Sequence, residues 1–183
     1  MTTNKENPFG VVRATPDDED AIYRVLCRLH GENGMWPMNP EKVLRELRMT
    51  TRAEVPSIIG LIKGDKGVIE GIVWLVMSDD WYTDWVRFNE RLLYVPPEHR
   101  QSAHAKRLVQ FAKWCADEVT AKLPKDPGQQ QEIPLLIGIN TFKQLEPKMR
   151  LYQRNFQQIG ALFSYRLVPM ELEPYNQRHV TRQ

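Results

Sequence analysis

The sequence predicts a single α/β domain with a mixed sheet, because runs typical of strands alternate with runs typical of amphipathic helices. Its 183 residues suit one compact domain, and the 42% of hydrophobic residues can supply a core. A strand, a long helix and a second strand follow one another within residues 85–139. We therefore expect one domain over residues 1–183, with residues 1–8 and 174–183 as loose tails.

The N-terminal part is predicted to contain one strand and two helices. Residues 9–14 form a short apolar stretch that is typical of a strand. Thr15 is followed by a proline and four acidic residues, which is the pattern of an N-cap and a first helical turn. Residues 30–38 break this helix with two glycines and a proline, and Asn39 begins a second helix.

Three strands are predicted in the middle of the chain. Residues 57–62 and 68–77 are rich in β-branched residues, and the glycine-containing segment 63–67 between them indicates a hairpin. Residues 85–95 form a third long strand after a polar turn.

The C-terminal half is predicted to continue with two more helices and two more strands. Apolar residues at helical spacing over 105–119 indicate a long amphipathic helix. A polar loop at 121–132 precedes a continuous apolar strand at 133–139, which is typical of a strand buried on both faces. A last helix over 145–156 and a final strand over 161–170 bring the expected total to four helices and six strands.

Composition argues against several classes of function. The net charge is only +2 and the basic residues are dispersed, which argues against nucleic-acid binding. Cys27 and Cys115 lie in apolar helical patterns and are expected to be buried thiols in a reducing compartment. The N-terminus lacks the apolar core of a signal peptide and no run approaches membrane-spanning length, so we expect a cytoplasmic protein. His30, His99 and His104 lack ligand spacing, so no metal site is expected.

The most informative motif lies at residues 95–108, where an apolar run ends at a double proline and a polar turn opens the long helix. The first N–H groups of a helix lack intrahelical partners and lie at the positive end of its dipole, so they bind anions. We expect these N–H groups to hold phosphate, with Arg100 adding positive charge. An ordinary capped helix with an exposed arginine is the alternative. The turn consists of Arg100, Gln101, Ser102, Ala103, His104, Ala105 and Lys106.

This motif resembles the one that marks the GCN5-related N-acetyltransferase (GNAT) superfamily. That family has V-x-P-x-x-R followed by Q/R-x-x-G-x-G/A. Val95, Pro97 and Arg100 match the first part, and Ala103 and Ala105 occupy the glycine positions of the second.

A second motif adds to the resemblance, which covers residues 10–170. Residues 151–156 read Leu-Tyr-Gln-Arg-Asn-Phe, with Gly160 downstream, and are similar to the family's L-Y-x-R-x-G-F. Ala103 and Asn155 stand where the family has glycine. Alanine adds only one methyl group, and asparagine tolerates the left-handed conformation, so the chain is identified as a divergent member of this superfamily.

The resemblance implies a sheet of six to seven strands with about four helices, and transfer of an acetyl group from acetyl-CoA to an amine. The CoA thioester would lie between the strands that end at Val95 and Ile139. Backbone groups of Leu93, Tyr94 and Val95 would contact the pantetheine arm and the thioester carbonyl. Asn140 would bond the amides of the arm, or would only form a turn.

Two residues are candidates for proton transfer. By the resemblance, Tyr152 is the general acid that protonates the leaving thiolate, although it also suits a plain core position. Glu90 is the candidate general base, with Asp84, Glu70 or water as alternatives. Arg91 occupies a position where many relatives have an acid.

The acceptor pocket is expected at the loop after the first helix and at the turn before residue 85. Acidic and aromatic residues there suit a cationic or amine-bearing acceptor, either a small molecule or a protein, but they equally suit a solvated turn and a capped core edge. The rival interpretation is a non-catalytic CoA-binding or interaction protein that retains the fold; a homodimer is compatible with both. The residues concerned are His30, Glu32, Asn33, Met35, Trp36, Asp79, Asp80, Trp81, Tyr82 and Asp84.

Overall fold

The computed structural model describes residues 7–34, 37–126, 128–139 and 145–159. It confirms the predicted mixed α/β fold class, and the predicted strand at 161–170 lies outside the described residues. Short 3-10 turns occur at η1 (Pro16–Asp18), η2 (Asp65–Gly67) and η3 (Pro97–His99). The other elements are β1 (Val12–Arg13), α1 (Glu19–Asn33), α2 (Pro40–Thr51), β2 (Ser57–Lys63), β3 (Ile69–Asp80), β4 (Thr83–Tyr94), α3 (His104–Thr120), β5 (Leu135–Leu136) and α4 (Leu145–Gln153).

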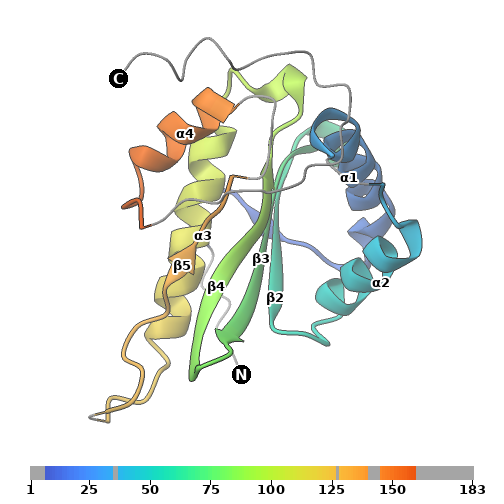
Figure 1. Cartoon of the computed structure of the whole chain (residues 1–183). Coiled ribbons are helices and arrows are strands. Elements are labelled where there is room, and N and C mark those ends of the chain that lie inside the picture. The colour runs from blue at the N-terminus through green and yellow to red at the C-terminus, as the bar shows by residue number, and fades with distance from the viewer. Residues whose placement is uncertain (1–6, 35–36, 127, 140–144, 160–183) are drawn as a thin grey trace.

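The described strands form one sheet in the order β1-β2-β3-β4-β5. Neighbouring strands are antiparallel from β1 to β4, and β4 pairs with β5 in parallel. Helices α3 and α4 lie on one side of the sheet, and α1 and α2 lie on the other (Figure 1). A mixed sheet with helices on both faces is the arrangement that the order of elements predicted.

The pairing between β4 and β5 is short. It includes only Phe88 and Asn89 of β4, which then continues to Tyr94 without a β5 partner. Pro134 has no N–H group and limits the ladder at its N-terminal end. At the other end, residues 137–139 follow β5 but do not pair with β4. The sequence predicted a strand over 133–139, so its length was overestimated. The two strands therefore part at the C-terminal half of β4.

A bulge interrupts β4 within the half that has no β5 partner. Trp74 of β3 pairs with Leu92 and Leu75 pairs with Glu90, so Arg91 is an extra residue on β4. A bulge bends its strand and re-aims side chains, because two residues then oppose one on the partner strand. Glu90 and Arg91 consequently do not follow the simple alternation of faces that a regular strand would impose.

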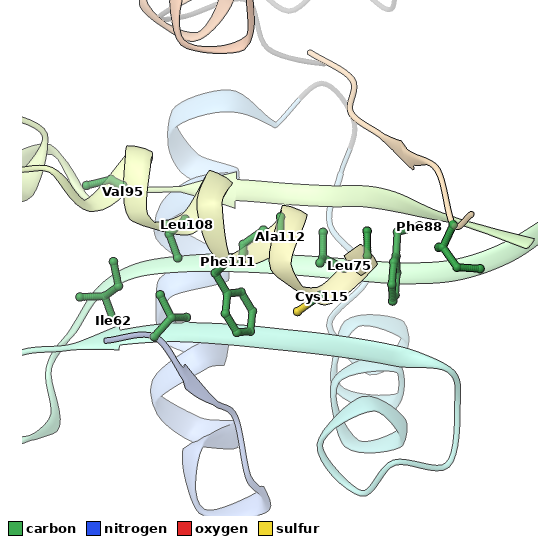
Figure 2. Close-up of a cluster of buried hydrophobic side chains, with 12 residues drawn as sticks. Ile62, Leu75, Phe88, Val95, Leu108, Phe111, Ala112 and Cys115 are labelled. Carbon is green, nitrogen blue, oxygen red and sulfur yellow. The ribbon is translucent and has the colours of Figure 1, made fainter. Parts of the chain in front are cut away.

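Two apolar clusters pack against opposite faces of the sheet. Leu108, Phe111 and Cys115 of α3 point onto one face, as Figure 2 shows. Ile22 of α1 and Leu47 of α2 are buried against the other. The predicted burial of Cys115 is confirmed, and desolvation raises the pKa of its thiol to about 12.

The helix starts follow the predicted capping signals. The side chain of Asn39 accepts a hydrogen bond of 3.0 Å from the backbone N–H of Lys42 in the first turn of α2. Thr15 precedes η1, and its N–H donates to the carboxylate of Asp18 over 3.0 Å. Within the described ranges, no helix has both the length and the apolar character needed to cross a bilayer.

Candidate functional site

A cleft of about 1310 Å³ opens where β4 and β5 part. Its walls are the C-terminal half of β4, the facing sides of α1 and α2, the start of α3, and α4. Leu93, Tyr94 and Val95 line it, as does Gly138 beyond β5. These are the neighbours that the sequence predicted for a CoA thioester, except that Asn140 lies outside the described residues.

The turn before α3 presents unused donors at the rim of this cleft. Among the described residues, the backbone N–H groups of Gln101, Ala103, Ala105 and Lys106 donate to no protein acceptor, whereas that of Ser102 bonds to the carbonyl of His99 over 3.1 Å. The N–H of the remaining turn residue, at position 104, bonds to the Ser102 hydroxyl over 3.2 Å. Four free donors on one turn, at the positive end of a helix of 17 residues, can hold an anionic group.

Arg100 is engaged within the protein. Its guanidinium forms an ion pair with Glu32 of α1, and its Nε donates to the carbonyl of Val95 over 3.1 Å. Tyr94 also donates its hydroxyl to Glu32. Burial alone would raise the pKa of Glu32, but the hydrogen bonds from Tyr94 and Arg100 hold it below its usual value. Glu32, which the sequence placed on the acceptor side, therefore compensates the charge of Arg100.

The structure brings the two candidates for proton transfer into contact. The hydroxyl of Tyr152 donates to the Glu90 carboxylate over 2.5 Å, and the side chain of Glu90 is only 2% exposed. Burial raises the pKa of Glu90, although Lys148 and Tyr152 oppose this effect. Burial and the carboxylate also raise the pKa of Tyr152. Glu90 lines the cleft, whereas Tyr152 lies behind it, so the general-acid role of Tyr152 stays a prediction.

Lys148 is a site residue that the sequence analysis missed. Its ammonium group lies 3.5 Å from the second oxygen of Glu90 and borders the cleft. The available signal was its position four residues before Tyr152, since residues four apart share one face of a helix. Glu90 thus faces a phenol and an ammonium group from the same helix.

The expected acceptor residues separate in space. His30 and Asn33 of α1 line the cleft, and Met35 and Trp36 lie outside the described residues. The turn that was predicted to complete the pocket joins β3 to β4 at Thr83, whereas the cleft lies at the other end of β4. A strand rises by about 3.3 Å per residue, so the turn before Thr83 is far from Glu90 and the cleft. The turn residues are Asp79, Asp80, Trp81, Tyr82 and Asp84.

The structure also brings together Glu70, His99 and His104, whose ligand-type atoms lie within 4.8 Å of one another. Spacing in the sequence did not reveal this cluster, because Glu70 belongs to β3. Nε2 of His104 is 2.8 Å from Glu70, and its Nδ1 is 3.3 Å from the guanidinium of Arg107. A guanidinium only donates, so Nδ1 accepts and Nε2–H donates to Glu70. This tautomer suits a hydrogen-bonded pair that fixes the start of α3 better than it suits a metal ligand.

No family model matches the chain, and no curated protein matches it in sequence. Solved structures do match. A protein described as a probable acetyltransferase is 19% identical, with a TM-score of 0.59, over 89% of this chain and 99% of its own. An integron cassette protein from the mobile metagenome of Cole Harbour Salt Marsh is 16% identical, with a TM-score of 0.64, over 93% and 98%.

A third match is AAC(6')-Iy in complex with the bisubstrate analog CoA-S-monomethyl-acetylneamine. It is 14% identical to this chain, with a TM-score of 0.60, over 85% of this chain and 95% of its own. Identities at this level report the fold alone. The chain therefore adopts the fold of the GNAT acetyltransferases, at a sequence distance that makes it a divergent example of that fold.

Proposed function

We propose that the protein is a CoA-dependent N-acetyltransferase, which moves an acetyl group from acetyl-CoA directly to an amine. One observation carries the proposal: Gln101 and Ala105, two of the residues with free N–H groups at the start of α3, and the buried carboxylate of Glu90 border the same cleft. The first feature suits a pyrophosphate and the second suits a base, and a cleft of about 1310 Å³ has room for two substrates.

The phosphate end of the cleft fits the donor. The N–H groups of Gln101, Ala103, Ala105 and Lys106 would bond to the pyrophosphate oxygens. Arg100 contributes less charge there than the sequence suggested, because it is paired with Glu32. AAC(6')-Iy, which has this fold, was solved with an analog that joins CoA to acetylneamine. This supports a CoA derivative and an acceptor side by side in such a fold.

The chemistry would be centred on Glu90. Bound acetyl-CoA supplies the acetyl group as an activated thioester. Glu90 takes a proton from the ammonium group of the acceptor, the freed nitrogen bonds to the carbonyl carbon, and the carbon–sulfur bond breaks. As that bond breaks, the nitrogen loses its second proton and the leaving thiolate takes one from Tyr152 or from water, so the proton lost by the nitrogen restores that donor through solvent. The proton held by Glu90 then passes to solvent. Burial raises the pKa of the Glu90 carboxyl, which makes its carboxylate a stronger base than an exposed one and suits it to accept this proton.

A screen of primary amines with acetyl-CoA tests the proposal. We expect release of free CoA thiol that depends on both the protein and one class of amine, and mass spectrometry should find one added acetyl group on that amine. Turnover should fall about 100-fold or more in Glu90→Gln, within the range of general-base contributions. Acetylation that proceeds equally well in Glu90→Gln would contradict the role of Glu90.

A second candidate is CoA binding without catalysis. The contact between Tyr152 and Glu90 favours it, because each group occupies the other. This alternative predicts tight binding of CoA and acetyl-CoA with no thiol release for any amine in the screen.

A further inference from the structure

Arg91 of β4 places a guanidinium against the α2 wall of the cleft, and the proposed reaction does not use this group. Arg91 is the extra residue of the bulge in β4, and it faces α2 rather than α4. Its Nη1 donates to Glu46 of α2 over 3.1 Å, and its side chain is 41% exposed. Its neighbour Glu90 faces Tyr152 and Lys148 of α4. The bulge therefore places a cation beside the proposed base but on the opposite wall.

The guanidinium of Arg91 is held in place from one side. Its central carbon lies 4.9 Å from the centre of the Trp74 ring, which is buried. That ring is itself fixed, because its Nε1 donates to Ser57 over 2.8 Å and the Ser57 hydroxyl donates to the carbonyl of Leu75 over 2.9 Å. A stacked guanidinium loses little freedom when it binds a ligand.

Part of the hydrogen-bonding capacity of Arg91 is unused. Among the described residues, only its Nη1 donates a hydrogen bond, which leaves Nε and Nη2 on one edge of the planar group. That edge matches the two oxygens of a carboxylate. Arg91 lines the cleft, so the edge is within reach of a bound acceptor.

The other charged residues that line the cleft also bear on whether it attracts a negatively charged ligand. Lys148 is paired with Glu90, and Arg100 is paired with Glu32. Lys42 of α2 also lines the cleft and, within the described part of the chain, its ammonium group has no acidic partner. Arg91 is paired with Glu46 in the same way, so among the described residues the positive charge that remains for a ligand is that of Lys42, beside the free donor edge of Arg91.

We propose that the acceptor amine carries a carboxylate, which the free edge of Arg91 binds while Lys42 adds attraction. The substrate class is then an amino acid or a peptide with an acidic residue. This inference rests on the proposed function and replaces the cationic acceptor that the sequence suggested from the distant turn at residues 79–84. A carboxylate on Arg91 would hold the acceptor beside Glu90, its neighbour on β4.

Matched pairs of amines test the inference. 4-Aminobutanoate and its amide have similar amines but differ in charge. The C-terminally amidated dipeptides Gly-Glu-NH2 and Gly-Gln-NH2 make the same comparison for a peptide acceptor. Binding is measured by calorimetry on protein saturated with CoA, and kcat/KM is measured by thiol release. We expect the carboxylate to be favoured about tenfold or more in at least one pair, as for charge-assisted hydrogen bonds. The pair that shows the preference distinguishes a small acceptor from a peptide.

Arg91→Met should remove this preference, and Lys42→Ala should weaken it by a smaller factor. Arg45→Met is the matched control: Arg45 is also close to Glu46, at 3.8 Å, but does not line the cleft, so the preference should persist. CoA affinity should be the same in all three variants. Equal binding of carboxylates and amides in both pairs would overturn the inference, and so would a preference that survives Arg91→Met. Acetylation of amines without a carboxylate preference would leave the proposed function intact, whereas failure to bind CoA would overturn that function itself.

Discussion

Glu90 and Arg91 are adjacent in β4, yet their environments are opposite. The Glu90 side chain is buried and contacts two groups of α4, whereas that of Arg91 is 41% exposed and contacts one group of α2. The bulge separates them, because it gives β4 one residue more than β3 at this point. A single irregularity in a strand can therefore place a buried carboxylate and an exposed guanidinium on opposite walls of one cleft.

Of the variants that test this contrast, the one that removes the Glu90 carboxylate should have the largest effect on turnover. In Glu90→Gln, we expect kcat to fall by about two to four orders of magnitude, because the base is lost while the shape is kept. The affinity for CoA should not change, since the free N–H groups before α3 are unaffected. Steady-state kinetics with the best amine, together with calorimetry for CoA, provide the measurement. A parallel loss of CoA affinity would show that Glu90 supports the structure of the cleft instead.

Tyr152→Phe separates two roles for the phenol. A general acid would be missing at every pH, so turnover would fall by about one to three orders of magnitude throughout. A positioning residue acts through Glu90: without its hydrogen bond, the already raised pKa of Glu90 rises further. Because the base is active above its pKa and is lost as pH falls through it, turnover would then recover at high pH.

The geometry favours the second outcome, because the Tyr152 proton is donated to Glu90. A pH profile of kcat/KM for the native protein and for Tyr152→Phe distinguishes the two. A plain core role would be indicated if the variant matched the native protein at every pH.

Lys148→Met should also raise the pKa of Glu90, but by less than Tyr152→Phe does. The ammonium group opposes the burial that raises the pKa of Glu90, so its removal moves the acidic limb of the kcat/KM profile to higher pH. Arg150→Met is a suitable control, because Arg150 lies on the same helix but is 60% exposed and pairs with Glu146. A limb that moves equally in both variants would mean that overall charge, rather than contact with Glu90, sets the pKa.

The regular parts of the fold could be predicted because local patterns determine them. The glycine-containing turn between β2 and β3, and the capping side chain of Asn39, have local signals that the structure confirms. The length of β5 was overestimated, because an apolar run does not show where a neighbouring strand diverges. Pro134 gave a warning only for the N-terminal end of this strand.

The candidate site could be predicted only in part, for a related reason. The turn before α3 is contiguous in sequence, so its N–H groups could be named in advance; the structure leaves four of them without a protein acceptor among the residues it describes, and their binding of phosphate stays a prediction. The bulge at Arg91, the contact of Lys148 with Glu90 and the pairing of Arg100 with Glu32 depend on residues that are distant in sequence. The acidic, aromatic turn at residues 79–84 was misplaced because composition does not show at which end of a strand a cleft opens.

Calorimetric titration of CoA into the native protein and into Ala103→Glu tests the central claim most directly. Ala103 is exposed and its N–H is one of the free donors, so a carboxylate there should repel the pyrophosphate. Ala103→Gln has the same bulk without the charge and serves as the control, and Ala103→Gly should bind at least as well as the native chain. We predict saturable binding to the native protein, retained in large part by Ala103→Gln and abolished by Ala103→Glu. Undiminished binding to Ala103→Glu, or no binding of CoA to the native protein at millimolar concentration, would contradict the account.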